Sequence, residues 1–191
     1  MSVSINRLPA KCSKTMIWGC VRWAQGKALA AFVNDQLCWL NIAPKQPAAR
    51  ELFDHYPASQ FEQDGFRAQT LLDEAFRALA QDRAVPIGIS GTPFQIQVWE
   101  ALTRIEPGTS CSYGELAARI GKDGAARAVG SAAAANGVAL FIPCHRLVPA
   151  ATSAATSAGA YRWGSLLKKQ LLEAERFAGV PAGTAGVNLA A

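Results

Sequence analysis

Histidine is scarce in this sequence, and its cysteines lack the spacing of a metal site or a disulfide framework. The 191 residues contain two histidines, His55 and His145, and five cysteines, none of them in a CxxC pair. An odd number of unpaired cysteines argues against a disulfide scaffold and against a closed zinc site. We therefore expect free thiols, a reducing compartment and no bound metal.

Long apolar runs are also missing from the sequence. Runs such as residues 138–142 are too short to span a bilayer, and the N-terminus has no apolar segment after its basic residues. Half of the residues are hydrophobic and 17% are charged, with a formal net charge of +5. This composition is typical of a globular protein, and the mild basic excess is compatible with nucleic acid. We expect no membrane association and a cytoplasmic location.

The first 90 residues combine short strand-like runs with two helical segments. Turn-like sequences, AQGK and VNDQ, separate runs of aromatic and β-branched residues, which predicts a meander of three strands. Strands are expected over 16–23, 28–33, 36–42 and 84–90, and helices over 46–56 and 66–81. In the second helix, apolar residues from Phe66 to Leu79 form one stripe. We predict a small antiparallel sheet with helices, and a domain boundary at the sequence SGTP.

From Pro93 onward the sequence is mainly helical. An amphipathic helix begins at Pro93, and Ser112 with Glu115 forms a capping box that begins another. Gly121 ends that helix, and a second one over 124–135 follows a short turn. Two short helices joined in this way predict a helix-turn-helix, although any αα-hairpin gives the same spacing. A last helix begins near residue 165, with Leu166 and the following leucines facing the core.

The helix over 124–135 consists almost entirely of Ala, Gly, Ser and Val. A helix that reads bases in the major groove carries several long polar side chains, but here Arg127 is the only one. Two interpretations stay open: a small-residue helix packed in a core, or a helix thin enough to enter the minor groove. On the second interpretation, Arg127 acts on the base stack and reads no sequence.

The sequence FIPCHRLV places Cys144 directly after Pro143 and before His145 and Arg146. We interpret the preceding apolar run as a buried strand that Pro143 ends, so that Cys144 lies at a sheet end. His145 can take the thiol proton, directly or through water, and Arg146 adds positive charge that favours the thiolate. The alternative is a buried structural cysteine. A cysteine protease is disfavoured, because adjacent residues of an extended chain point to opposite faces.

The last helix carries Lys168 and Glu175, seven positions apart and therefore on one face. Taken alone, such a pair is most simply two solvated charges. Before this helix, residues 149–160 form a loop rich in Ala, Ser and Thr, which we expect at the rim of any site around Cys144.

Taken in order, the motifs GTPFQIQVWEAL, SYGELAARIG, ARAVGSAAAANG, PCHRLV and YRWG resemble those of the O6-alkylguanine-DNA alkyltransferases. This is the methylated-DNA–protein-cysteine methyltransferase family, which includes the C-terminal domain of the bacterial adaptive-response protein. The resemblance covers about residues 91–177, and PCHR is highly specific to the family. It implies an α+β protein: an RNase H-like domain over 1–90, a winged-helix-like DNA-binding domain over 91–180 and a flexible tail over 181–191.

The resemblance also implies direct-reversal DNA repair. The protein, as a monomer, would bind duplex DNA in the minor groove and flip an alkylated guanine into a pocket, with O4-alkylthymine as a further candidate substrate. Cys144 would accept the alkyl group, with His145 activating it through water and Glu175 orienting the histidine. Each molecule would act once, because the thioether formed cannot be hydrolysed there, and no cofactor is needed. The site of action would be the bacterial nucleoid or the eukaryotic nucleus.

The same resemblance assigns the remaining site residues. Tyr113 would lie beside the flipped nucleotide and donate a proton to the leaving guanine, while Arg127 fills the vacated stack. Lys168 would support the site, and Asn136 would fix the turn before the active-site strand. The expected DNA contacts are Arg127, Tyr113, Ala126, Ala128, Gly130 and Ser131. The expected pocket residues are Pro143, Val148 and Tyr161.

Two other functions compete with this one. An alkyltransferase-like protein flags DNA lesions without repairing them, but that class replaces the cysteine that stands here as Cys144. A transcriptional regulator of the adaptive-response kind would need a cysteine-rich zinc domain and a second helix-turn-helix. We expect neither in this sequence.

Overall fold

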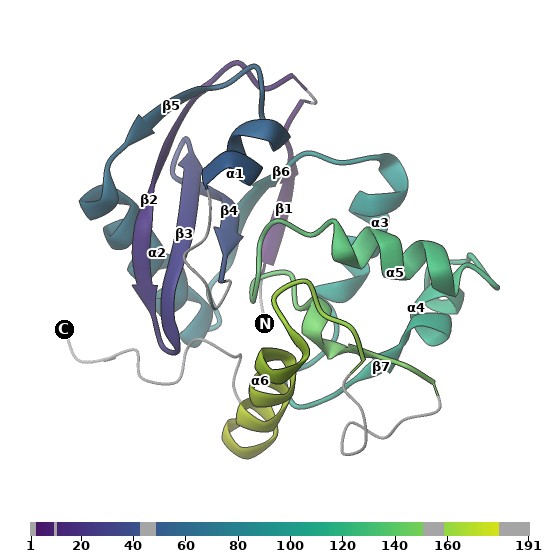
Figure 1. The fold of residues 1–191 in the computed structure, drawn as a ribbon. Coiled ribbons are helices and arrows are strands. Elements are labelled where there is room, and N and C mark those ends of the chain that lie inside the picture. The colour runs from purple at the N-terminus through teal and green to yellow at the C-terminus, as the bar shows by residue number, and fades with distance from the viewer. Residues whose placement is uncertain (1–2, 10, 43–48, 151–158, 180–191) are drawn as a thin grey trace. The chain divides into compact units, whose positions relative to one another are not determined.

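The computed structural model describes residues 3–9, 11–42, 49–150 and 159–179. The chain divides into two compact units, one within residues 2–90 and one within 91–182, here called the N-terminal and the C-terminal unit. Figure 1 shows a sheet with helices in the first and mostly helices in the second. The described part thus has the predicted α+β fold, with six α-helices. None of its helices combines the length and the hydropathy needed to cross a membrane.

The N-terminal unit is built on a six-stranded sheet with the order β1-β6-β4-β3-β2-β5. The predicted meander is confirmed, because β2 (Thr15–Trp23), β3 (Gly26–Val33) and β4 (Gln36–Asn41) pair antiparallel in sequence order. Asn34 and Asp35 join β3 to β4 with φ angles of 49° and 58°. Two successive residues in this left-handed region are typical of a tight hairpin turn, which fixes the register of the meander.

The prediction of a purely antiparallel sheet is wrong. Strands β1 (Val3–Arg7) and β5 (Gln60–Gln63) pair in parallel with β6 (Val85–Ile89) and β2, and β4 also pairs in parallel with β6. The sheet is therefore mixed. Both missed strands are short and lie at the edges of the sheet. Strand β5 has a single apolar residue, Phe61, whereas β1 alternates apolar Val3 and Ile5 with polar residues over a stretch too short to stand out.

Two helices belong to the N-terminal unit, α1 (Ala49–His55) and α2 (Gly65–Ala80). Helix α1 matches the end of the predicted 46–56 helix, whose first three residues lie outside the described part. Helix α2 begins after Asp64, whose side chain accepts from the backbone N–H of Arg67. Phe66, expected in the apolar stripe, is 86% exposed. At 100° per residue it lies roughly 120° away from the buried face of this helix.

The C-terminal unit contains α3 (Pro93–Leu102), α4 (Tyr113–Arg119), α5 (Ala126–Ala134) and α6 (Ser165–Ala178). A small parallel pair, β7 (Cys111–Ser112) with β8 (Leu147–Val148), was not predicted. The capping box of Ser112 and Glu115 begins α4 as expected. Leu166 of α6 is 70% exposed, against expectation, because it lies almost opposite the buried leucines of that helix.

Helices α3, α4 and α5 contact one another, and α4 with α5 forms the predicted pair of short helices. The small residues of α5 serve two faces. Val129, Ala132 and Ala133 are buried, and the indole N–H of Trp99 donates to the carbonyl of Ala132 at 2.9 Å. Arg127 lies on the exposed face of the same helix. The core interpretation thus describes one side of this helix, and the opposite side is exposed.

Candidate active site

The backbone before Cys144 is a buried series of turns, so the prediction of a strand ended by Pro143 is wrong. Within residues 138–142, the N–H of Ile142 donates to the carbonyl of Val138 at 3.1 Å. The buried side chain of Asn136 closes these turns: its Oδ1 accepts from Val138 N at 2.9 Å, and its Nδ2 donates to Ile142 O at 2.9 Å. An apolar run alone cannot reveal such local bonding, because a buried turn and a buried strand have the same composition.

Cys144 begins a short 3-10 helix, Cys144–Arg146, that leads directly into β8. Its side chain is 6% exposed, and its Sγ accepts a hydrogen bond from Nδ2 of Asn136 at 3.2 Å. Burial raises the pKa of the Cys144 thiol to about 11, although the Asn136 bond and the positive charge of Lys168 partly offset this. At neutral pH the sulfur therefore carries its proton, and a base must remove it before the sulfur can act as a nucleophile.

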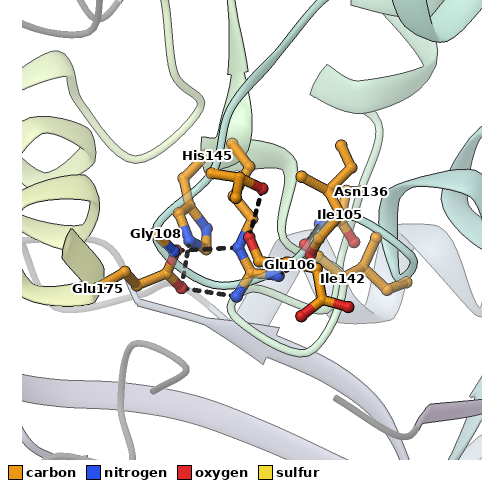
Figure 2. A network of polar contacts seen from close by, with 9 residues as sticks. Ile105, Glu106, Gly108, Asn136, Ile142, His145 and Glu175 are labelled. Carbon is orange, nitrogen blue, oxygen red and sulfur yellow. Dashed lines mark hydrogen bonds and ion pairs between the residues drawn. The ribbon is translucent and has the colours of Figure 1, made fainter. Parts of the chain in front are cut away.

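His145 and Glu175 form a buried pair, both fully shielded, with Nε2 and Oε1 3.0 Å apart. Figure 2 shows the two side chains pointing toward each other. Burial lowers the pKa of His145, opposed in part by the bond to Glu175, so the imidazole is neutral at pH 7. Burial would raise the pKa of Glu175, but hydrogen bonds from His145 and Arg146 outweigh it and hold this pKa well below its usual range.

The charge of Glu175 fixes the tautomer of His145. An ionised carboxylate can only accept hydrogen bonds, so Nε2 of the neutral imidazole must carry the proton and Nδ1 must not. Nδ1 is buried and makes no hydrogen bond to any described residue. The ring therefore presents one unprotonated nitrogen that can take a proton, with a carboxylate behind it to stabilise the resulting imidazolium.

Arg146 also binds Glu175 and does not serve Cys144 as expected. Its Nε donates to Oε2 at 2.9 Å, its Nη2 donates to Oε1 at 2.7 Å, and its Nη1 donates to the carbonyl of Ile105. The backbone N–H of Gly108 lies 3.4 Å from the same carboxylate. The expectation that Arg146 favours the thiolate is wrong. Its charge is taken up by Glu175, so this arginine anchors the carboxylate that holds His145.

Lys168 is fully buried, as is Glu175. The interpretation of these two residues as solvated charges is therefore wrong. Nζ of Lys168 donates to the carbonyls of Leu147 at 2.5 Å and Ala160 at 3.3 Å. Burial lowers the pKa of this ammonium to about 8. Lys168 thus links the peptide after Cys144 to the segment before α6, and it places a positive charge near the sulfur.

Cys144 lies in the wall of a cavity of about 630 Å³. The residues predicted for the site that line it are Tyr113, Arg127, Gly130, Ser131, Cys144 and Tyr161. Burial and the neighbouring Cys144 raise the pKa of Tyr113, so its hydroxyl keeps its proton. Pro143 and Val148 are buried and are not among the lining residues. The cavity has room for a flat heterocycle and places a thiol, a phenol and an arginine around it.

The remaining predicted residues lie on α5 or outside the described part. Ala126 is half-buried, and Ala128 is exposed on the same helix as Arg127. Of the loop 149–160, residues 151–158 lie outside the described part, as does the tail from residue 180. Sequence reasoning missed Arg162, which also lines the cavity. An arginine between the two aromatic residues of YRWG was the available sign.

Among the residues described, no cluster of three or more His, Cys, Asp or Glu side chains is placed to hold a metal ion. The buried carboxylate of Glu175 is instead engaged with nitrogen donors of His145 and Arg146. The chemistry that this site offers is thus that of a buried thiol beside a neutral imidazole.

A family described as "6-O-methylguanine DNA methyltransferase, DNA binding domain" matches residues 93–177. Among curated relatives, the bifunctional transcriptional activator/DNA repair enzyme Ada of Escherichia coli is 43% identical over 154 residues, which is 78% of this chain and 42% of Ada. The methylated-DNA–protein-cysteine methyltransferase of Mycobacterium leprae is 43% identical over 83 residues, 44% of this chain and 50% of the relative. The chain thus spans about half or less of the length of these relatives.

The fold has solved counterparts. The crystal structure of Mycobacterium tuberculosis OGT in complex with DNA is 29% identical, with a TM-score of 0.66 over 87% of this chain and 96% of that one. The Mycobacterium tuberculosis O6-methylguanine methyltransferase is 28% identical, with a TM-score of 0.65 over 85% and 93% of the two chains. The similarity thus extends beyond residues 93–177 into the N-terminal unit.

Proposed function

We propose that the chain, whose residues 93–177 match the 6-O-methylguanine DNA methyltransferase family, belongs to that family and repairs alkylated DNA by direct reversal. The alkyl group of O6-alkylguanine moves irreversibly to Cys144. The observation that carries the proposal is the cavity wall itself. The thiol of Cys144 lies in this wall and accepts a hydrogen bond from Asn136. The next residue in the sequence, His145, is a neutral imidazole, and Glu175 fixes its tautomer.

The geometry of the site supports the following proton steps. Nδ1 of His145, acting through a water molecule, takes the proton from Sγ of Cys144, and Glu175 stabilises the imidazolium. The thiolate attacks the alkyl carbon, a C–S bond forms, and the C–O6 bond breaks with its electron pair going to the guanine. The hydroxyl of Tyr113 donates a proton to the guanine, and the proton held by His145 restores the phenol. The products are an S-alkylcysteine and an unmodified guanine.

The reaction is a single turnover. An S-alkylcysteine is a thioether, and none of the described residues that line the cavity can displace the alkyl group from sulfur. Nothing in these steps requires a cofactor, because the nucleophile, the base and the acid are all side chains of the chain itself. The protein is then both the catalyst and the acceptor, and the amount of repair equals the amount of protein.

The exposed face of α5 supports a DNA-binding role for the α4–α5 pair. Ala128 and Ser131 are small and exposed beside Arg127, so this face is thin enough for the minor groove. Arg127 fills the stack that the flipped base leaves, and the base enters the cavity. We include in the proposal a winged-helix-like C-terminal unit, an RNase H-like N-terminal unit, action as a monomer and a location with the DNA, in the nucleoid or the nucleus.

Intact-mass measurement after incubation with a duplex containing O6-methylguanine tests the proposal. We expect one added methyl group per molecule, mapped to Cys144 and absent in Cys144→Ala. Cys111→Ala is the matched control, since Cys111 is a second buried cysteine of the C-terminal unit. It should accept the methyl group as the wild type does. A wild type that binds the lesion without gaining mass would instead indicate an alkyltransferase-like binding protein.

A further inference from the structure

Arg162 is a second arginine beside the cavity that holds Cys144. It comes from the segment before α6, whereas Arg127 comes from α5, and both side chains line the cavity. Neither the sequence patterns nor the proposed steps give Arg162 a role. Its side chain is exposed, so it can meet a bound molecule at the edge of the cavity.

The guanidinium of Arg162 is held in place despite this exposure. Its Nη1 donates to the carbonyl of Ala134 at 3.2 Å, and its Cζ lies 5.8 Å from the centre of the Trp163 ring. The first contact ties the segment before α6 to the last residue of α5, and the second is a cation–π contact. A side chain already held in this way loses less conformational entropy when it binds a ligand.

The location of this charge matters because α5 is poor in cations. Arg127 is the only charged residue of the sequence ARAVGSAAA, and Ala134 stands at the C-terminal end of the helix. That end carries partial negative charge on its carbonyls, which disfavours a nearby phosphate. The positively charged guanidinium of Arg162, bonded to the Ala134 carbonyl, makes the local charge at this helix end positive.

We propose that Arg162 binds a backbone phosphate of the DNA next to the flipped nucleotide, as the second cation of the DNA-binding surface. The inference rests on the proposed function. A guanidinium offers several N–H donors in a planar fork, which suits phosphate oxygens. The contact strengthens binding to DNA of any sequence. It is distinct from the smaller effect of the Arg162 charge on Cys144, whose pKa it lowers slightly.

Salt dependence of DNA binding separates this role from a structural one. Affinity for a short unmodified duplex is measured over a range of salt for the wild type, Arg162→Gln and Arg162→Lys. Glutamine keeps a donor for the Ala134 carbonyl but has no charge. We expect Arg162→Gln to bind roughly tenfold more weakly at low salt. The slope of log K against log salt should become shallower by about 0.9, the value for one lost phosphate contact. Arg162→Lys should keep the slope of the wild type.

Two controls complete the test. Arg67→Gln removes an exposed arginine whose guanidinium donates to Asp35 in the N-terminal unit, and it should keep the slope. Free O6-benzylguanine has no phosphate, so Arg162→Gln should slow its reaction less than it slows reaction with duplex DNA at low salt. Any slowing with the free base reports the loss of a positive charge near Cys144. An unchanged salt slope in Arg162→Gln would overturn the proposal, and so would an equal loss of rate on free base and duplex. If the wild type gains no alkyl group from either substrate, the proposed function fails instead.

Discussion

The side-chain amide of Asn136 donates a hydrogen bond to the sulfur of Cys144 over 3.2 Å and, from the same nitrogen, to the carbonyl of Ile142. One buried residue thus both closes the turns before the cysteine and contacts the nucleophile. A thiolate is a stronger hydrogen-bond acceptor than a thiol, so this donor favours the reactive form. The turns over residues 138–142, where a strand was expected, therefore also hold the amide of Asn136 in contact with the Cys144 sulfur.

Asn136→Asp should make Cys144 less reactive. The carboxylate still accepts from Val138, but it cannot donate to the sulfur, and its negative charge disfavours a thiolate. We expect the pKa of Cys144 to rise, so that iodoacetamide modifies it more slowly at a given pH. Intact mass against time measures this, with Cys144→Ala giving the background from other cysteines. Equal rates in both proteins across the pH range would contradict the role given to Asn136.

Lys168→Met should also raise the pKa of Cys144, because the ammonium favours the thiolate in the wild type. The pKa of Lys168 is about 8, so the wild type itself loses this charge as the pH rises through that value. The difference in iodoacetamide rate should therefore be largest below pH 8 and shrink above it. Lys169→Met, an exposed neighbour, is the matched control and should follow the wild type. A difference that is constant with pH would show that Lys168 acts by packing alone.

The elements that could be predicted from the sequence are those with a local signature. Apolar periodicity and capping residues locate β2, β3, β4 and the helices within a few residues, because burial of one face governs each of them. Strand β5 escapes this reasoning, and β1 shows only a short apolar alternation at Val3 and Ile5. They exist through pairing with segments far away in the chain, which no local pattern reports.

The site residues divide in the same way: some have a local sequence signature, and others are brought together only by the fold. The sequence PCHR and the family resemblance point to Cys144 and His145, but not to the partner of Arg146. That partner, Glu175, lies 29 positions later, and only the folded chain shows that one carboxylate serves both His145 and Arg146. Arg162 was missed for a similar reason, since its contact with Ala134 joins two distant segments.

Glu175→Gln should destabilise the protein by about 3–5 kcal/mol at pH 7, because it removes the negative charge that the buried guanidinium of Arg146 binds. The native pKa of Glu175 is depressed below its ordinary 4.5, so its charge contributes stability above pH 4.5. That contribution is lost as the pH falls from 4.5 toward the native pKa, and the gap between the two proteins should narrow there. Denaturant unfolding at several pH values measures the gap. Glu173→Gln, an exposed glutamate of the same helix, should stay near the wild type at every pH.

Arg127→Ala should slow alkyl transfer from duplex DNA and spare the reaction with free O6-benzylguanine. If the guanidinium fills the vacated stack, its removal leaves the cost of unstacking, a few kcal/mol, without compensation, and transfer slows roughly tenfold or more. Single-turnover transfer from duplex measures the rate. Arg104→Ala, an exposed arginine outside α4 and α5, is the control and should keep the wild-type rate.

A mispaired lesion makes this test of Arg127 sharper. A mismatched base is already partly unpaired and costs less to flip, so the effect of Arg127→Ala should be smaller on a mismatched duplex than on a paired one. Arg162→Gln should weaken binding to both duplexes equally, because a phosphate contact does not depend on base pairing. If Arg127→Ala slowed transfer equally on paired, mismatched and free substrates, Arg127 would be part of the cavity wall and would have no role in base flipping.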